Sequence, residues 1–295
     1  MSRLLTLGLV QHACGEDPSV NLARCVEGIR EASRRGARLV VTQELFRTRY
    51  FCQREDASAF DLAEPVPGPT TERLAVLAAE LGVVVVASLF ERRAAGLYHN
   101  TAVVLDHDRG LVGRYRKMHI PDDPGYYEKY YFTPGDLGLT PVETSIGRLG
   151  ILVCWDQWFP EAARLMTLAG AELLVYPTAI GWDPRDPADE QARQMDAWRT
   201  IQRAHAIANG LPVAACNRIG FEPEPGSADG GIQFWGGSFL CGAQGELLAE
   251  APADRATVLV ASLDLNRTEQ VRRAWPYLRD RRIDAYEGLS RRYLD

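Results

Sequence analysis

The sequence predicts an α/β fold in one domain, and three observations support this prediction. Short apolar runs typical of strands alternate with longer segments whose apolar residues recur at helical spacing. Hairpin signals are mixed among them, so antiparallel strands are expected beside parallel ones. No internal repeat, low-complexity tract or interdomain linker divides the 295 residues. We therefore expect a layered α/β core in which residues 1–295 form a single domain.

Composition excludes several classes of protein. The net charge of -6 gives no basic footprint, so we expect no nucleic-acid partner. No apolar run reaches the length of a membrane span, and the first residues read as a strand rather than a signal peptide. We therefore expect a cytoplasmic protein that does not bind membranes.

Metal and cofactor signatures are missing from the sequence. The six cysteines include no Cys-x-x-Cys pair, and the five histidines form no His-x-His or His-Glu-x-x-His motif. Glycine-rich phosphate and dinucleotide motifs and the Gly-x-Ser-x-Gly motif are missing as well. We expect no metal and no organic cofactor, which leaves any chemistry to the protein's own side chains.

The first half of the chain reads as strands with two helices. Apolar residues at helical spacing predict helices over residues 18–35 and 70–81. Residues 47–69 are long for a structureless connection, which favours a binding loop. Asp108-Arg109-Gly110 predicts the turn of a β-hairpin. Strands are expected at residues 4–10, 38–42, 83–90, 98–106 and 111–116.

The second half continues the alternation of strands and helices. An apolar strand over residues 149–153 stops on Cys154, and a helix is expected to follow over residues 160–168. A long amphipathic helix is predicted over residues 188–209, and residues 220–231 read as a flexible polar loop. Further strands are expected at residues 172–176, 212–217, 232–240, 246–249 and 257–264. A helix and an arginine-rich tail end the chain.

Three residues with chemical potential stand where predicted strands end, namely Glu44, Lys117 and Cys154. Functional groups gather at the carboxyl ends of strands in open α/β sheets. Of the 33 lysines and arginines only Lys117 and Lys129 are lysines. A lysine in so arginine-rich a chain suggests a position that needs a compact ammonium group. A nucleophile, a base and a cation together suit thiol acyl transfer. Each also has a plainer interpretation: a local surface partner for Glu44, a solvated Lys117 and a buried core Cys154.

Two loops are candidates for a ligand pocket. Residues 121–136 are rich in tyrosine and acids, with Glu128 and Tyr130 near the middle, and read as an ordered wall over a pocket. The alternative is a packed surface loop in which Glu128 pairs with an arginine. Residues 177–184 form the second loop, after another buried strand.

The local contexts of the three strand-end residues carry a family resemblance. Glu44 in TQELF, Lys117 in GRYRKMHIP and Cys154 in LVCWDQWFPE match, in order, the Glu-Lys-Cys triad of the nitrilase (carbon–nitrogen hydrolase) superfamily. The match covers essentially the whole chain. The stretches YRKMHIPDDPGYYEKYYFTPGD and CWDQWFPEAARLMTLAGAELLVYPTAIG, with the later NRIG and RDRR, most resemble members that hydrolyse N-carbamoyl amines.

The resemblance implies a specific architecture and assembly. It implies a four-layer α-β-β-α sandwich with two sheets packed face to face, which pairs in the family as an αββααββα dimer and often assembles further. We therefore expect a homo-oligomer, with the tail at about residues 265–295 in subunit contacts. The resemblance also identifies Glu128 as the second glutamate of the family, beside the nucleophile.

The same resemblance implies the chemistry. Cys154 would attack a ureido carbonyl, with Glu44 as general base. Lys117 and the backbone N–H of Trp155 would stabilise the tetrahedral oxyanion. Ammonia would depart, and a carbamoyl thioester would remain on Cys154. Water activated by Glu44 would then hydrolyse it and release the amine and carbon dioxide.

The implied partner is a small carbamoyl amine such as N-carbamoylputrescine, on a route from agmatine to putrescine. Its distal ammonium suits an acidic, aromatic-lined pocket. Asp183 is the expected ammonium partner, although it could equally be a solvated turn residue before Pro184. N-carbamoyl-β-alanine remains an alternative substrate, which would need an arginine for its carboxylate, and a non-catalytic binding or assembly role is the alternative of a different class. The expected substrate-binding residues are Trp155, Tyr130, Thr178, Ala179, Trp182 and Asp183.

Overall fold

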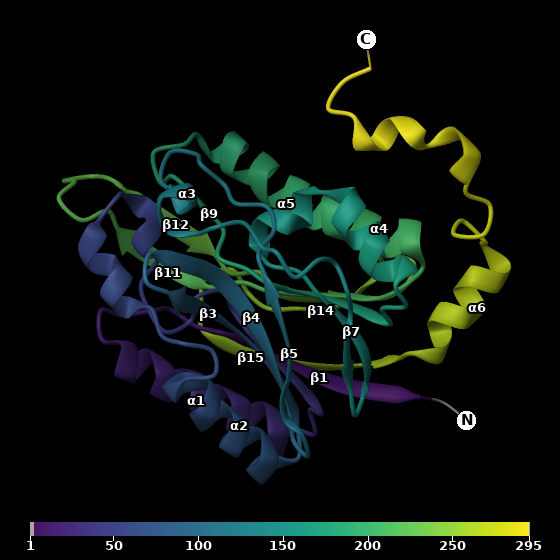
Figure 1. Ribbon diagram of the computed structural model, residues 1–295, viewed down its shortest axis with the longest axis horizontal. Coiled ribbons are helices and arrows are strands. Elements are labelled where there is room, and N and C mark those ends of the chain that lie inside the picture. The colour runs from purple at the N-terminus through teal and green to yellow at the C-terminus, as the bar shows by residue number, and fades with distance from the viewer. Residues whose placement is uncertain (1–2, 295) are drawn as a thin grey trace.

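Two six-stranded sheets face each other between two pairs of helices, as Figure 1 shows. The structure is a computed structural model that describes residues 3–294. One sheet carries two helices on its outer face at the bottom of the view, and the other carries two at the top. The predicted α-β-β-α sandwich is therefore confirmed.

The first sheet combines parallel strands at its centre with antiparallel strands at both sides. In spatial order its strands are β15 (Thr257–Asp264), β1 (Leu4–Gln11), β2 (Leu39–Thr42), β3 (Val84–Ala94), β4 (Leu97–Asp106) and β5 (Gly110–Arg116). The outer helices are α1 (Pro18–Arg34), which Asp17 caps by accepting from the Ser19 N–H at 2.7 Å, and α2 (Pro69–Leu81). The predicted hairpin is β4–β5, in which Asp106 pairs with Gly110.

The second sheet repeats this plan. In spatial order its strands are β14 (Leu247–Glu250), β13 (Phe239–Cys241), β10 (Val213–Cys216), β8 (Leu173–Pro177), β7 (Gly147–Ile151) and β6 (Val142–Thr144). Helices α4 (Pro160–Leu168) and α5 (Ala188–Asn209) cover its outer face. The chain then runs through α6 (Asn266–Ala274) into a tail that leaves the body of the molecule.

The central strands are apolar on both faces because each face meets another layer. In β2, Val41 packs between the two sheets, while Val40 packs under the outer helices with Ile29 of α1 and Leu74 of α2. Parallel strands buried in this way read as continuous apolar runs, which is why the sequence reveals them. The strands β1, β2 and β3 run parallel, as do β7, β8 and β10, so the carboxyl ends of each set meet at one edge.

The prediction of one strand over residues 232–240 was wrong. The chain forms β12 (Gly231–Trp235) in a small third sheet and only then enters β13 of the second sheet. Gly236 and Gly237 between them have φ of 56° and 62°, the left-handed region that glycine adopts at little cost. A Cβ on Gly236 would lie 2.4 Å from a methyl of Ile219, so the bend also needs the space.

The small third sheet also changes two predicted loops. It contains β11 (Ile219–Pro223), β12 and β9 (Gly181–Trp182) in that order. Part of the predicted 220–231 loop and part of the 177–184 loop are therefore strands. Residues 47–69 contain two short 3-10 helices, Phe51–Gln53 and Ala57–Leu62, rather than only irregular chain.

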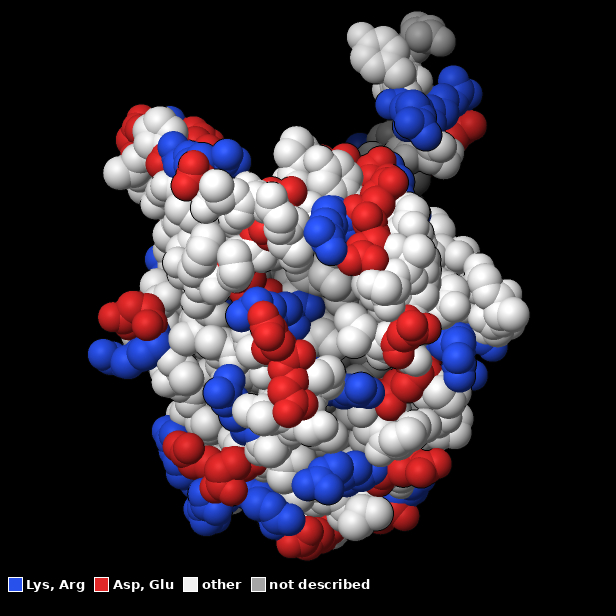
Figure 2. All heavy atoms as spheres, turned by 90° about the vertical axis from the view of Figure 1, so that its left-hand side faces the viewer, with Lys and Arg blue, Asp and Glu red and all other residues white. Residues whose placement is uncertain are grey.

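Charged groups are mixed in sign over the face turned to the viewer in Figure 2, with acidic and basic side chains side by side. No helix within residues 3–294 combines the length and the apolar character needed to cross a membrane.

Candidate active site

Of the four ionisable side chains predicted to carry the chemistry, the lysine bonds directly to both glutamates. Lys117, just after β5, donates through Nζ to Glu44 Oε1 at 2.8 Å and to Glu128 Oε2 at 2.7 Å. Glu44 follows β2, and Glu128 begins the short helix α3 (Glu128–Tyr131). All three are at most 1% exposed. Cys154 lies in the wall of a cavity that Glu128 also lines, so the structure brings all four residues to one place.

Burial sets the protonation of the thiol and the lysine. It raises the pKa of the Cys154 thiol well above its usual range, and the negative charge of Glu44 adds to this while Lys117 opposes it. Burial alone would lower the pKa of Lys117, but Glu128 and Glu44 outweigh it and hold the ammonium charged. A neutral thiol needs a base to take its proton before it can attack.

The surroundings of the Glu128 carboxyl shift its pKa upward. Burial raises its pKa to about 7 against the opposing charge of Lys117, and the like charge of Glu44 raises it further. Its Oε1 accepts from the Tyr50 hydroxyl at 2.6 Å, so both of its oxygens are engaged. Glu128 therefore holds the lysine in place, and its bonding gives it no free oxygen with which to act as a second base.

Cys154 sits on a turn with a constrained backbone. Its φ is 41°, and it opens a 3-10 helix, Cys154–Trp158, ahead of α4. Asp156 secures this turn by accepting from the Val153 N–H at 2.9 Å. The same carboxylate accepts from the Tyr115 hydroxyl at 2.8 Å and lies 2.7 Å from His119 Nδ1. Tyr115 and His119 flank Lys117, so Asp156 joins the lysine segment to the cysteine turn.

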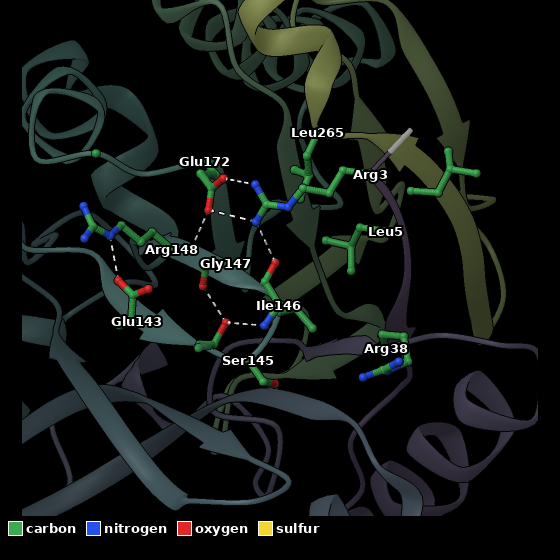
Figure 3. Close-up of a pocket in the computed structure, with 13 residues that line it drawn as sticks. Arg3, Leu5, Arg38, Glu143, Ser145, Ile146, Gly147, Arg148, Glu172 and Leu265 are labelled. Carbon is green, nitrogen blue, oxygen red and sulfur yellow. Dashed lines mark hydrogen bonds and ion pairs between the residues drawn. The ribbon is translucent and has the colours of Figure 1, made fainter. Parts of the chain in front are cut away.

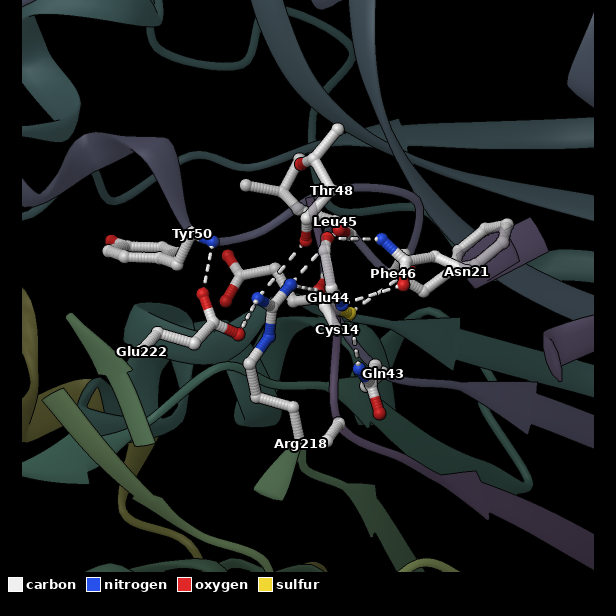
Figure 4. A network of polar contacts seen from close by, with 12 residues as sticks. Cys14, Asn21, Gln43, Glu44, Leu45, Phe46, Thr48, Tyr50, Arg218 and Glu222 are labelled. Carbon is white, nitrogen blue, oxygen red and sulfur yellow. Dashed lines mark hydrogen bonds and ion pairs between the residues drawn. The ribbon is translucent and has the colours of Figure 1, made fainter. Parts of the chain in front are cut away.

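The turn that carries Glu44 is fixed by a buried arginine (Figure 4). Arg218 is fully buried and donates to the carbonyl oxygens of Glu44 at 2.8 Å and Leu45 at 3.0 Å. Its charge is balanced by Glu222 at 2.8 Å. Leu45 has a φ of 47°, which a residue other than glycine rarely adopts. Arg218 therefore stabilises the turn from which Glu44 reaches Lys117.

A cavity of about 660 Å³ opens beside Cys154. This volume suits a small organic ligand. Aromatic side chains, among them Trp155, Trp158 and Tyr126, line it together with charged ones. The lining residues with charged side chains are Asp123, Glu128, Asp183, Asp186, Glu190 and Arg193.

Of the predicted substrate-binding residues, some line the cavity and others lie behind its wall. Trp155, Trp182 and Asp183 line the cavity. Thr178 and Ala179 contribute backbone atoms behind it, since the Thr178 carbonyl accepts from the Glu44 N–H and the Ala179 carbonyl lies 3.7 Å from the Cys154 thiol.

Tyr130 does not line this cavity. It is 38% exposed and packs its ring against Phe60 and Tyr131, beside a separate hollow. The short helix α3 causes this, because it turns Glu128 inward and the residue two positions later outward.

Sequence reasoning missed several residues that contact the four candidates. Tyr50 bonds Glu128, and Asn100 donates to Glu44 Oε1 at 2.7 Å. Asn100 stands directly before the apolar run of β4, and Tyr50 stands in the irregular segment that follows Glu44. Neither position reveals from the sequence that its side chain is buried against a candidate residue. Arg218 was visible in the NRIG stretch, but its contact lies 174 residues away in the chain.

A second cavity, of about 760 Å³, lies at the opposite edge of the sheets (Figure 3). Residues at the amino ends of β1, β2 and β8 line it. Its charged groups are largely paired with each other, Arg3 with Glu172 and Arg148 with Glu143. No cysteine lines it, so it lacks the thiol that lines the cavity beside Cys154.

Within residues 3–294 one group could offer three ligand atoms to a metal ion, namely Asp106, His107 and Asp108 in the β4–β5 hairpin. Asp106 already bonds Arg109 and Ser145. None of the three lines the cavity beside Cys154.

Comparisons with known proteins agree with this geometry. The family described as carbon–nitrogen hydrolase matches residues 6–273. The N-carbamoylputrescine amidase of Solanum lycopersicum is 46% identical over 292 residues, which covers 98% of this chain and 95% of that protein. A citrullinase of Francisella tularensis is 39% identical, covering 98% and 99%. The crystal structure of a carbon–nitrogen hydrolase from Helicobacter pylori superposes with a TM-score of 0.95 at 52% identity, covering 99% and 100%.

Proposed function

The chain belongs to the carbon–nitrogen hydrolase family, and we propose that it hydrolyses N-carbamoylputrescine to putrescine, carbon dioxide and ammonia. The observation that carries this proposal is the buried Glu44–Lys117–Glu128 group, whose Glu128 lines the same cavity as the Cys154 thiol and several acidic side chains. The name of the tomato relative supports the choice of substrate.

The first half of the reaction makes a covalent intermediate. Glu44 accepts the proton of the Cys154 thiol as the sulfur attacks the ureido carbonyl carbon. The oxyanion that forms is stabilised by the Lys117 ammonium and the Trp155 backbone N–H. Glu44 returns the proton to the terminal nitrogen, the carbon–nitrogen bond breaks, and ammonia leaves a carbamoyl thioester.

The second half hydrolyses the thioester. Water gives a proton to Glu44 and attacks the same carbon, so that a second oxyanion forms in the same site. The carbon–sulfur bond then breaks and the thiol regains its proton from Glu44. The released carbamic acid loses carbon dioxide to give the free amine.

The outer part of the cavity selects the amine. Asp183 is the proposed partner of the distal ammonium, with Trp182 as an aromatic wall. In the free protein the Asp183 carboxylate accepts from Arg185 Nε at 2.9 Å, so the ammonium shares or replaces this arginine. Asp186 and Glu190 line the same region and add negative charge.

A substrate comparison tests the proposal. Ammonia release is measured with N-carbamoylputrescine, N-carbamoyl-β-alanine and citrulline in parallel. We expect kcat/KM to be highest for N-carbamoylputrescine, and Asp183→Asn to raise its KM about tenfold, since a charge-assisted hydrogen bond contributes about 1.5 kcal/mol. Asp196→Asn, an exposed acid of α5 outside the cavity, is the matched control.

Preference for a substrate that carries a carboxylate would reject the putrescine assignment. Arg193 is the cavity-lining group that would then matter, because its guanidinium could pair with the carboxylate of citrulline or N-carbamoyl-β-alanine. It is held by Asp189 and Glu190 at 2.8 Å each. The absence of ammonia from all three compounds would favour the non-catalytic role.

We also propose that the tail packs on a second copy of this chain. Residues 275–294 expose large apolar side chains, among them Trp275 at 57% and Tyr293 at 80%. Leu165 and Leu168 of α4 are exposed as well, on the layer nearest the tail. Exposed apolar side chains that gather in one region often mark an interaction surface. The six free, buried thiols fit the proposed cytoplasmic location, where thiols stay reduced.

Sedimentation velocity tests the assembly. The unaltered chain is expected to sediment as a dimer or larger, and Leu165→Arg with Leu168→Arg to shift it toward the monomer. Val76→Arg, at a side chain 69% exposed on α2 in the opposite outer layer, should leave the assembly unchanged. A monomeric wild-type chain would rule the proposal out.

A further inference from the structure

The two oxygens of the Glu44 carboxylate have different surroundings. Oε1 accepts two hydrogen bonds, from Lys117 Nζ at 2.8 Å and from Asn100 Nδ2 at 2.7 Å. Oε2 is buried and has no hydrogen-bond partner among residues 3–294. A buried carboxylate oxygen without a donor is costly unless a ligand or a proton supplies what is missing. The free oxygen is therefore the one available to take a proton.

The orientation of the Asn100 amide follows from its neighbours. The Leu45 backbone N–H, which can only donate, donates to Ser88 Oγ at 3.2 Å. Ser88 therefore directs its own hydrogen elsewhere, and it donates to Asn100 Oδ1 at 3.1 Å. With its oxygen committed to Ser88, Asn100 must present its NH₂ group to Glu44. A flipped amide would place two acceptors, Asn100 Oδ1 and Glu44 Oε1, against each other.

Asn100 also touches the lysine segment. Its backbone carbonyl oxygen accepts from the Lys117 backbone N–H at 2.8 Å, just beyond the paired part of β4 and β5. Asn100 and Ser88 are both fully buried, on adjacent strands of the first sheet. Neither lines the cavity beside Cys154. Asn100 contacts the carboxylate through Oε1, and Ser88 is linked to it through Asn100.

We propose that Asn100, oriented by Ser88, is a positioning residue that holds Glu44 Oε1 and leaves Oε2 as the oxygen that exchanges protons with Cys154 and the substrate. This inference rests on the proposed role of Glu44 as general base. It gives Ser88 of β3 and Asn100 of β4 a role in catalysis beside that of Glu44, Lys117 and Cys154. Without the Asn100 donor, the carboxylate can rotate about its last bond and present either oxygen.

The test compares Asn100→Leu, which has similar volume and no donor, with Ser88→Ala, which keeps the amide and removes the group that orients it. We expect Asn100→Leu to lower kcat about 10²-fold, as a small misplacement of a catalytic group does. Ser88→Ala should lower it up to about tenfold, the equivalent of one hydrogen bond. KM should change less than twofold in both, because neither residue reaches the cavity.

A second readout does not depend on the substrate. The rate at which iodoacetamide alkylates Cys154, followed by peptide mass spectrometry, reports how readily the thiol loses its proton. This rate should fall in both variants while the final extent of labelling stays complete. A merely structural role would lower the fraction of competent sites and leave the rate at each site unchanged.

Thr101→Val is the matched control. Thr101 follows Asn100 in β4, is fully buried, and donates to Glu91 outside the site at 2.6 Å. It should lose stability like the other variants and keep its alkylation rate.

Wild-type alkylation rates in both Asn100→Leu and Ser88→Ala would overturn the inference. If Asn100→Leu folds too poorly to be measured, a wild-type rate in Ser88→Ala alone would overturn it. If the wild type released no ammonia from any carbamoyl compound, the proposed function would fail. The alkylation rates would still decide the role of Asn100.

Discussion

Replacing Cys154 with alanine is expected to lower kcat by at least about 10⁴-fold while the protein stays folded, since loss of a covalent nucleophile costs other hydrolases up to about 10⁶. In the proposed mechanism the sulfur forms the carbamoyl thioester, and no other thiol lines the cavity. Ammonia release is the assay, with the unfolding temperature measured alongside. Substrate binding, measured by calorimetry, should persist because the cavity walls are unchanged.

Cys25→Ala is the control for this experiment. Cys25 is as buried as Cys154 but packs in the outer layer between α1 and the first sheet. It should lose some stability and keep the activity of the folded protein. Activity in Cys154→Ala above the stated limit would mean that the thiol is not the nucleophile.

Replacing Lys117 with methionine is expected to damage both catalysis and stability. The loss of one oxyanion donor typically lowers kcat by about 10²–10³. Two buried carboxylates, Glu44 and Glu128, would also lose their cation, and breaking a buried ion pair costs about 3–5 kcal/mol of unfolding free energy. Kinetics and denaturant unfolding measure the two effects separately.

The stability loss in Lys117→Met should grow with pH. The pKa of Glu128 is already raised to about 7 with the lysine present, and removal of the ammonium raises it further. Between about 4.5 and that value the folded protein holds a proton that the unfolded chain has released, so unfolding free energy falls as pH rises. The deficit relative to wild type is therefore expected to be larger at pH 8 than at pH 5.

Lys129→Met provides the comparison. It removes the only other lysine, which is exposed and adjacent to Glu128 in the chain. Activity and stability should both stay close to wild type. Equal losses in the two lysine variants would indicate a general charge effect rather than the contacts of Lys117.

Much of the fold could be predicted because its signals are local. The central strands are buried on both faces and so appear as unbroken apolar runs, and helices such as α5 show helical spacing over many turns. The prediction of one strand over residues 232–240 failed because the apolar pattern does not show where the chain bends. Its apolar pattern is continuous, and only the positive φ of Gly236 and Gly237 sends the two halves to different sheets.

The candidate site could be predicted in its residue types but not in its contacts. Glu44, Lys117 and Cys154 stand at strand ends, and their motifs carry the family resemblance, so the sequence alone indicated the chemistry. It did not indicate that Tyr130 would face away from the cavity or that Arg185 would bond Asp183. Those outcomes depend on the direction of single side chains, which local spacing does not determine.

The sequence by itself determined the layered α/β class, the family and the residues able to supply a nucleophile, a base and a cation. Only the tertiary structure decided how these groups are held. Arg218 reaches the Glu44 turn across 174 residues, and Asn100 reaches the Glu44 carboxylate across 56. The physical reason is that an apolar pattern is repeated along the chain and can be read there. A buried polar contact instead depends on which distant segments the packed sheets bring within about 3 Å.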